Sequence, residues 1–320
     1  MNTFPGFNNR LAILKDRSVC LAKARSFFTE RGVLEVDTPI LSHTAPIDVH
    51  IDILRVLLPH DQLGYLHSSP EYAMKRLLIE GLGDIYQLGH VFREGEFGAL
   101  HNPEFTMAEW YRIGVAYNTF IEETLEFVRC FLGKLPSEAL SYREALLRYA
   151  DIDYLLASKD DLLARIKHYH IDLHGDPRSW KRGALLDLLL SFVVEPHLGQ
   201  EKLTILCDYP ASAAALACTR YKGDEHVAER FEVYYQGIEL ANGYHELADP
   251  AELRRRFEEA NTIRQSSGKV PLPIDEHFLS ALERGLPDSC GVAVGFDRLM
   301  LLRHRAKNLH EILPFTWDFV

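Results

Sequence analysis

The sequence of 320 residues has few cysteines and no cysteine pattern. Its five cysteines are scattered along the chain, and no two of them form a C-x-x-C pair. An odd number at irregular, wide spacing is not typical of the disulfide frameworks of small secreted proteins or of four-cysteine zinc sites. We therefore expect reduced thiols, no zinc site and a cytoplasmic protein.

Long hydrophobic runs are also missing. The most apolar segment, Ala184 to Val194, contains Asp187 and Ser191 and is shorter than the roughly 20 residues that a membrane helix needs. Near the N-terminus, Arg10 and Lys15 flank the short apolar run "LAIL", which is too short for the apolar region of a signal peptide. We expect neither membrane insertion nor secretion, and we interpret residues 184–194 as a buried helix.

An excess of basic residues is absent, because the formal net charge is −11. This balance argues against a broad basic surface for nucleic acid. The chain also lacks the phosphate-binding loop G-x-x-x-x-G-K-[ST], the dinucleotide motif G-x-G-x-x-G and the metal motif H-E-x-x-H. Any phosphate substrate must therefore be held mainly by side chains.

What the chain does contain is the composition of a soluble globular protein, 47% hydrophobic and 25% charged. Helical patterns occupy residues 16–31, a segment with Ser69 as its capping residue and Pro70 as its first helical residue, much of 113–205, and 250–266. Ser141 with Glu144, and Ser158 with Asp161, have the spacing of capping boxes. Strand-like segments are found at 33–41, 43–67, 84–93, 101–112, 202–210, 230–247 and 291–302.

Two arginines and two acids stand out as candidates for chemistry. Arg93 in "FREGE" and Arg298 in "GFDR" either form surface ion pairs, which are common, or bind phosphate groups. Glu239 and Glu246 in "GIELANGYHEL" are either solvent-facing acids of a strand or ligands of Mg²⁺ that bridges to phosphates. His101 is expected to be a hydrogen-bonded packing residue rather than an acid or base.

The stretch "HNPEFTMAEWYR", residues 101–112, combines anchoring and polar side chains. Phe105 and Trp110 can hold a strand in place while Glu109 and Tyr111 present an acid and a hydroxyl to a pocket. Such a pocket favours a cation.

Several motifs resemble one known family. The segments "RGVLEVDTPIL", "FREGEFGALHNPEFTMAEWYR" and "GVAVGFDRL" are similar, in order, to motifs 1, 2 and 3 of the class II aminoacyl-tRNA synthetases. "SPEYAMKRLL" and "GIELANGYHEL" resemble the lysine and ATP site of the lysyl-tRNA synthetase subgroup, and the matches span residues 31–303. The resemblance implies an α+β fold: one class II synthetase-like catalytic domain, residues 1–320, with a mainly antiparallel sheet flanked by helices and a helical insertion at about 113–205. It also implies a homodimer built through motif 1.

The same resemblance implies roles for individual residues. Arg93 and Arg298 would be catalytic, and Mg²⁺ would be held by Glu239 and Glu246. The residues implied to bind ATP are Arg93, Glu94, Gly95, Glu96, Asn102, Glu239, Leu240, Gly295 and Arg298. The residues implied to bind the amino acid are Ser69, Pro70, Glu71, Glu109, Tyr111, Glu246 and Ala293. Their acids would select lysine or a lysine-like compound, because its second ammonium group pairs with a carboxylate.

Two departures from the synthetases bear on the substrates. Motif 2 continues with Glu94, Gly95 and Glu96, which leaves open which acid meets the adenine. Motif 1 already reaches Pro39, whereas an anticodon-binding barrel needs on the order of 100 residues, so we expect the catalytic domain to stand alone.

Such a domain is similar to a bacterial paralogue group that attaches (R)-β-lysine to a lysine of translation elongation factor P. Ala293 agrees with this group, because the synthetases usually carry Gly there. The partners implied are elongation factor P and (R)-β-lysine or lysine, with no stable nucleic acid and no membrane. The alternatives are a lysine-activating enzyme that uses tRNA, a non-catalytic regulatory protein, and a ligase with ammonia as acceptor, like the synthetase-like asparagine synthetase.

Overall fold

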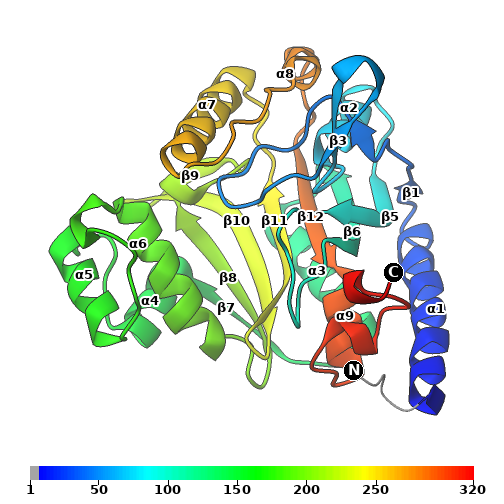
Figure 1. Ribbon diagram of the computed structural model, residues 1–320, viewed down its shortest axis with the longest axis horizontal. Coiled ribbons are helices and arrows are strands. Elements are labelled where there is room, and N and C mark those ends of the chain that lie inside the picture. The colour runs from blue at the N-terminus through cyan, green and yellow to red at the C-terminus, as the bar shows by residue number, and fades with distance from the viewer. Residues whose placement is uncertain (1–6) are drawn as a thin grey trace. The chain divides into compact units, whose positions relative to one another are not determined.

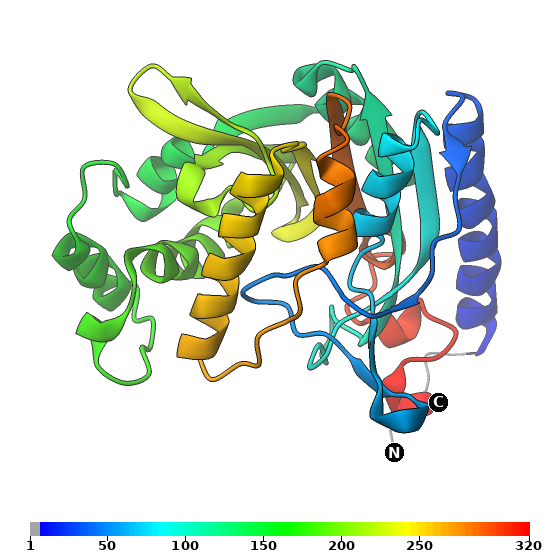
Figure 2. The same ribbon diagram turned by 90° about the horizontal axis from the view of Figure 1, so that it is seen from above.

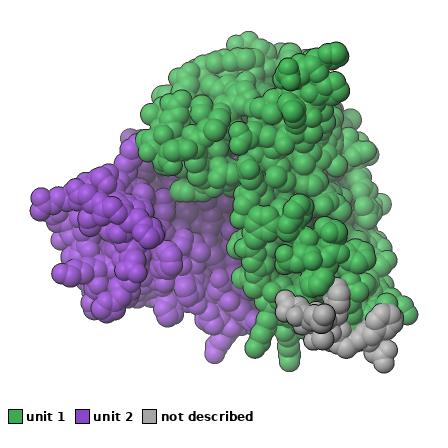
Figure 3. All heavy atoms as spheres, in the orientation of Figure 1, with its two compact units in different colours: residues 1–133, 246–320 green, residues 134–245 purple. Residues whose placement is uncertain are grey.

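The computed structural model describes residues 7–320, and residues 1–6 of the predicted domain lie outside this range. The chain divides into two compact units, one from residues 1–133 and 246–320 and the other from residues 134–245 (Figure 3). Among residues 7–320, no helix combines the length and the hydropathy that crossing a bilayer requires.

The first unit contains a sheet whose strands are mostly antiparallel (Figure 1). In spatial order they are β1 (Leu34–Glu35), β5 (Ile85–Phe92), β6 (Glu104–Ile113) and β12 (Ser289–Gly295). Only β1 joins its neighbour in parallel within this set. A small antiparallel sheet of β2 (Leu41–Ser42), β4 (Leu63–Leu66) and β3 (Arg55–Leu57) belongs to the same unit.

Helices accompany this sheet: α1 (Phe7–Thr29), α2 (Glu71–Ile79), α3 (Tyr117–Leu132), α7 (Pro250–Ser266), α8 (Glu276–Leu282) and α9 (Phe296–Arg303). The predicted helix at 16–31 is α1, which begins earlier, at Phe7, and is the long blue helix in Figure 2. It contacts α3 and β1. Gly32 follows it with φ +69°, a left-handed conformation that glycine adopts without strain.

An aromatic cluster fixes the central strands of the first unit. The ring of Phe28 stacks on Tyr86, with 4.1 Å between centroids, and lies 5.2 Å from Trp110 and 5.3 Å from Phe127. Each such pair adds about 0.5–1.5 kcal/mol to the stabilisation from burial. Because side chains alternate along a strand, burying Trp110 here directs its neighbours on β6 to the opposite face of the sheet.

The start of α2 differs by one position from the prediction. Pro70 is the N-cap residue rather than the first helical residue, and Ser69 Oγ accepts the backbone N–H of Glu71 at 3.0 Å. The serine therefore satisfies an amide of the helix start, as expected of a capping residue. It also places Glu71 in the first turn of the helix.

The strand predicted over 291–302 is wrong in its second half. The strand β12 ends at Gly295, and Phe296–Arg303 forms the helix α9. Phe296 is buried against Phe131 of α3, with centroids 5.6 Å apart, so the apolar run continues into the core as a helix.

The second unit contains further strands of the large sheet and three α-helices. The strand order is β11 (Ile238–His245), β10 (Glu225–Tyr235), β8 (Leu203–Pro210) and β7 (Ser137–Ser141), with β9 (Thr219–Lys222) paired to β10. The helices are α4 (Tyr142–Ala150), α5 (Lys159–His168) and α6 (Arg182–Leu189), followed by a π-helical turn, Leu190–Val194. Both predicted capping boxes are present at the starts of α4 and α5.

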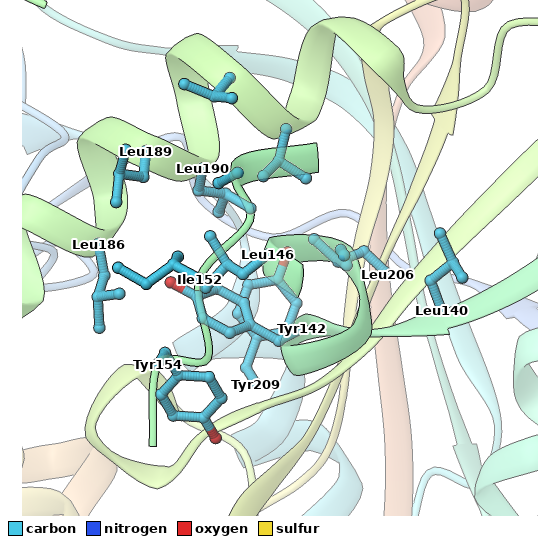
Figure 4. Packing of buried hydrophobic residues seen from close by; sticks show 14 of the residues in the cluster. Leu140, Tyr142, Leu146, Ile152, Tyr154, Leu186, Leu189, Leu190, Leu206 and Tyr209 are labelled. Carbon is cyan, nitrogen blue, oxygen red and sulfur yellow. The ribbon is translucent and has the colours of Figure 1, made fainter. Parts of the chain in front are cut away.

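A buried cluster joins these helices to β8. Figure 4 shows Leu146 of α4 beside Tyr142, with Leu186 of α6 and Tyr209 of β8 in the same cluster. The predicted insertion at about 113–205 includes α4, α5 and α6, and also α3 of the first unit and the strand β7. Its boundaries stay a prediction.

Candidate active site

The pairing of β6 with β12 brings three predicted amino-acid ligands together with one glycine. Ala293 lies opposite Glu109, and Gly291 lies opposite Tyr111. Since residues two apart on a strand share a face, these four positions form one patch on the face of the sheet away from Trp110. This patch on β6 and β12 is where the pocket predicted from "HNPEFTMAEWYR" would have its floor.

Glu109 is buried and hydrogen-bonded at both carboxylate oxygens. Ser69 Oγ donates to Oε2 at 2.7 Å, and the Tyr111 hydroxyl donates to Oε1 at 2.8 Å. Burial, reinforced by the nearby charge of Glu71, raises the pKa of Glu109 to about 8. A cation beside this carboxyl group would favour its ionised form, so the site is suited to binding an ammonium group.

A lysine that sequence reasoning did not single out lies beside this pocket. Lys75 of α2 is fully buried, and its Nζ lies 2.6 Å from Glu71 Oε1 and 2.5 Å from Glu246 Oε2. Burial acts to lower the pKa of Lys75, but the charges of Glu246 and Glu71 outweigh it, and the pKa is raised. The residue is therefore a buried ammonium group that joins two of the predicted substrate ligands.

Gly291 allows Tyr111 and Glu246 to meet. A Cβ atom at this position would collide with the ring of Tyr111 and with Glu246 Oε1. Glu246 is further tied to β12 by its backbone N–H, which donates to the carbonyl of Ser289 at 2.9 Å. A glycine inside a strand indicates close approach of another group, and this signal in "GVAVGFDR" could have revealed the residue.

Together these contacts form a largely buried acidic cluster within the first unit. Its carboxylates are Glu71, Glu109 and Glu246, and Lys75 is a cation among them. Burial also raises the pKa of Tyr111 well above its ordinary value, so this hydroxyl stays a hydrogen-bond donor. The structure thus brings together the predicted amino-acid ligands Ser69, Pro70, Glu71, Glu109, Tyr111, Glu246 and Ala293.

Arg93 follows β5 and is only partly exposed. Its guanidinium lies 4.9 Å from the ring centroid of Phe105, and Nη1 lies 3.4 Å from Glu96 Oε1. Its Nε is buried and has no hydrogen-bond partner among residues 7–320. The backbone N–H of Glu94 donates to the carbonyl of Asp52 at 2.8 Å, which fixes the start of the loop. A buried guanidinium donor is suited to an anion.

Arg298 extends from the first turn of α9, whose N-cap residue is Gly295. Its Nη2 donates to His101 Nε2 at 3.1 Å. Burial and the charge of Arg298 lower the pKa of His101, so the ring is neutral and accepts this bond. His101 is thus hydrogen-bonded, as the sequence indicated, but it is exposed rather than packed in the core, and its partner is a predicted ATP ligand.

A buried network that sequence reasoning missed supports Arg298. Arg17 Nη1 lies 2.6 Å from Asp297 Oδ1, and Arg17 Nη2 donates to Thr106 Oγ1 at 2.8 Å. The backbone N–H of Thr106 donates to Asp297 Oδ2 at 2.9 Å. These contacts join α1, β6 and the start of α9. Because they fix Asp297, they also position its neighbour Arg298.

The side chain of Asn102 forms two hydrogen bonds with the protein backbone. Its Nδ2 donates to the carbonyl of Glu104 at 2.7 Å, and its Oδ1 accepts the backbone N–H of Trp317 at 3.0 Å. These bonds attach residues near the C-terminus to the loop before β6. The predicted contact of Asn102 with ATP stays a prediction.

Glu239 and Leu240 lie on β11 in the second unit. The buried Glu232 on β10 accepts hydrogen bonds from the hydroxyls of Tyr209 at 2.6 Å and Tyr234 at 2.5 Å. Burial, with the charges of Glu232 and Glu239, raises the pKa of Glu195 to about 7. The second unit therefore has an acidic cluster of Glu195, Glu232 and Glu239. Sequence reasoning indicated only Glu239.

The predicted Mg²⁺ pair is divided between the units, because Glu246 belongs to the first. Its side chain is 1% exposed, with one oxygen at Lys75 and the other at Gly291. This environment favours the amino-acid role of Glu246 over a role as metal ligand. Within residues 7–320, no group of three or more His, Cys, Asp or Glu residues is arranged to hold a metal.

Comparisons with known proteins agree with the motifs. The model of the family described as tRNA synthetases class II (D, K and N) matches residues 7–318. A protein of Edwardsiella ictaluri named elongation factor P–(R)-β-lysine ligase is 45% identical over 313 residues, which is 96% of each chain. Proteins of the same name from Salmonella typhi and Klebsiella pneumoniae are each 44% identical over 310 residues, which is 95% of each chain.

The family match covers almost the whole chain. The relatives are also similar enough over their full lengths to share a common ancestor and a common fold with this chain. The α+β fold, the mostly antiparallel strand pairs and the order of the motifs agree with it. The chain belongs to the class II tRNA synthetase family of the D, K and N type.

Proposed function

We propose that this chain is an ATP-dependent ligase that activates (R)-β-lysine, or lysine, and transfers it to a lysine of translation elongation factor P. The names of the relatives support the substrates. The observation that carries the proposal is the buried cluster of Glu71, Glu109 and Glu246 beside Tyr111. Ionised carboxylates that are buried away from water need cationic partners, and a substrate with two ammonium groups supplies them.

Specificity follows from the same cluster. An amino acid with an apolar side chain would supply one ammonium group instead of two and leave one acid without its partner, and an acidic one would add a like charge. The hydroxyls of Ser69 and Tyr111 already donate to Glu109, so its oxygens are held in place before a substrate arrives. The pocket is therefore preorganised for a diamino acid.

The first chemical step is adenylation. A carboxylate oxygen of the amino acid attacks the α-phosphorus of ATP, a new oxygen–phosphorus bond forms, and the bond to pyrophosphate breaks. No proton is transferred, because the carboxylate is already ionised, so the protein acts by positioning and by neutralising charge. Arg93 would bind the α-phosphate and Arg298 the triphosphate tail. Mg²⁺, when bound, would neutralise phosphate charge, with Glu239 among its ligands.

The second step moves the aminoacyl group to the acceptor. The neutral amine of a lysine on elongation factor P attacks the carbonyl carbon of the mixed anhydride. An amide bond forms, AMP leaves with the electron pair, and the nitrogen loses a proton to solvent.

Assembly and location are part of the proposal. The short strand β1 is an edge of the first unit's sheet, and nearby apolar side chains are exposed: Leu34 by 50%, Ile40 by 43% and Leu41 by 40%. An exposed edge with apolar side chains is suited to a homodimer. The reduced cysteines and the net charge of −11 support a cytoplasmic ligase that forms no stable complex with nucleic acid.

Mass spectrometry of elongation factor P tests the function directly. After incubation with the protein, ATP, Mg²⁺ and (R)-β-lysine, the factor should gain the mass of one lysine residue on a lysine side chain. Arg93→Ala should abolish the gain, while Arg55→Ala, at an exposed arginine of the same unit, should not change it. Charging of total tRNA without modification of the factor would favour the tRNA alternative, and no reaction with either acceptor would favour a regulatory protein.

A further inference from the structure

Lys75 has no role in the chemistry described so far, and its position is unusual. It lies on α2 and is fully buried, although a lysine is rarely placed where its ammonium group has no access to water. Replacing a buried ion pair by packed apolar side chains is often neutral or stabilising, so stability alone does not explain the residue. Its surroundings suggest a role in the pocket.

The contacts of Lys75 are with two predicted substrate ligands from distant parts of the chain. Its Nζ is 2.6 Å from Glu71 Oε1 one helical turn away, and 2.5 Å from Glu246 Oε2, which follows β11. Each carboxylate thus has one oxygen fixed by the ammonium group. The other oxygen of Glu246 lies over Gly291, beside Tyr111. Lys75 therefore determines where both acids point.

The charges in the pocket give a second reason. When ionised, the three acids Glu71, Glu109 and Glu246 carry three negative charges. The positive charge of Lys75 offsets one of them, so the net charge of the four side chains is −2. The remaining two match the two ammonium groups of a diamino acid. With a neutral side chain at position 75, the excess negative charge would repel the carboxylate of the substrate or cause one acid to take up a proton.

We propose that Lys75 is a positioning residue of the amino-acid pocket, which holds Glu71 and Glu246 oriented as ligands for the two ammonium groups of the substrate. This inference rests on the proposed function. It predicts a specific loss of amino-acid affinity when the charge at position 75 is removed, because the acids then repel each other and lose their fixed geometry.

The test is pyrophosphate exchange with Lys75→Met. The Michaelis constant for lysine or (R)-β-lysine should rise at least tenfold, while that for ATP should change less than about twofold. Lys15→Met, at an exposed lysine of the same unit, is the matched control and should leave both constants unchanged. Lys75→Gln keeps a hydrogen-bond donor without the charge, and it serves as the second variant if Lys75→Met does not fold.

A pH series separates positioning from a purely structural role. The groups that face Lys75 or lie beside it are Glu71, Glu246, Glu109 and Tyr111. Without Lys75, an acid of the pair should hold a proton to higher pH. The variant's Michaelis constant for the amino acid should then fall more steeply with rising pH than that of the wild type.

The outcomes distinguish the two proposals. If the wild type exchanges pyrophosphate with neither lysine isomer, the proposed function fails. If the wild type is active and Lys75→Met keeps its amino-acid constant, or binds more tightly, the positioning role is overturned, and tighter binding would mean that Lys75 competes with the substrate ammonium. Equal losses for ATP and amino acid would point to a general structural defect and also overturn it.

Discussion

The raised pKa of Glu109 makes the free energy of unfolding depend on pH. Its carboxyl group has a pKa of about 8 in the folded protein, against an ordinary value of 4.5. Between these values the folded protein holds a proton that the unfolded chain has lost. Stability therefore falls as the pH rises through this window, and the loss is complete above the folded pKa.

The magnitude follows from the width of the window. One pH unit inside it is worth about 1.4 kcal/mol for a single group, so raising the pH from about 5.5 to about 7.5 should cost the folded state roughly 3 kcal/mol through Glu109. Glu109→Gln carries no titrating group and resembles the protonated acid in shape. The free energy of unfolding of the variant, minus that of the wild type, should therefore grow by roughly 3 kcal/mol over this range.

Urea unfolding at several pH values between these limits, without ATP or amino acid, measures this difference. Titrating groups far from position 109 affect both proteins equally and cancel in the comparison. Glu80→Gln, at an exposed acid, is the control for replacing a carboxylate by an amide. Parallel stability profiles of the wild type and Glu109→Gln would show that Glu109 is not a buried acid with a raised pKa.

The same variant should lose function, although its stability relative to that of the wild type increases with pH. Removing the charge deprives a buried substrate ammonium of its partner, at a cost of about 2–5 kcal/mol. In pyrophosphate exchange, the amino-acid requirement should rise strongly while ATP binding is nearly unchanged. A stabilised variant with normal affinity for lysine would contradict the assignment of Glu109 to the amino-acid pocket.

Three further predictions concern the floor of the pocket, the support of motif 3 and the assembly. Gly291→Ala should raise the Michaelis constant for the amino acid at least tenfold in exchange assays, since its methyl group would displace Tyr111, and an unchanged constant would place the substrate elsewhere. Arg17→Met should lower the free energy of unfolding in urea by about 3–5 kcal/mol, because it leaves Asp297 as a buried unpaired charge; a loss below about 1 kcal/mol would refute this. Light scattering at micromolar concentration should give a dimer mass that Leu34→Glu reduces to a monomer mass, and a monomeric wild type would refute the motif 1 interface.

Local features were predictable where they depend on neighbouring residues. The capping boxes at Ser141 and Ser158 follow from side chains three positions apart, which meet in any helix start. The strand β6 with Glu109 and Tyr111 on one face follows from alternation along a strand. The motifs likewise identified the family before the fold was known.

The error at 291–302 shows where such reasoning stops. An apolar run with one charged pair is compatible with either a strand or a buried helix, and periodicity does not distinguish them. The change from β12 to α9 at Gly295 depends on partners far away in the sequence. Phe296 packs against Phe131, and Asp297 pairs with Arg17.

The sequence by itself determined the family and the order of the motifs, and it indicated most of the residues of the proposed amino-acid pocket. The tertiary structure decided the environment of each residue. In the sequence, Lys75 is an ordinary helical lysine, and Glu246 is equally suited to a metal or to an ammonium group. Their contact at 2.5 Å joins segments that are far apart along the chain, and burial gives it strength because water no longer screens the charges. Charge pairing of this kind depends on which segments the fold brings together, whereas helix caps and strand alternation depend only on adjacent residues.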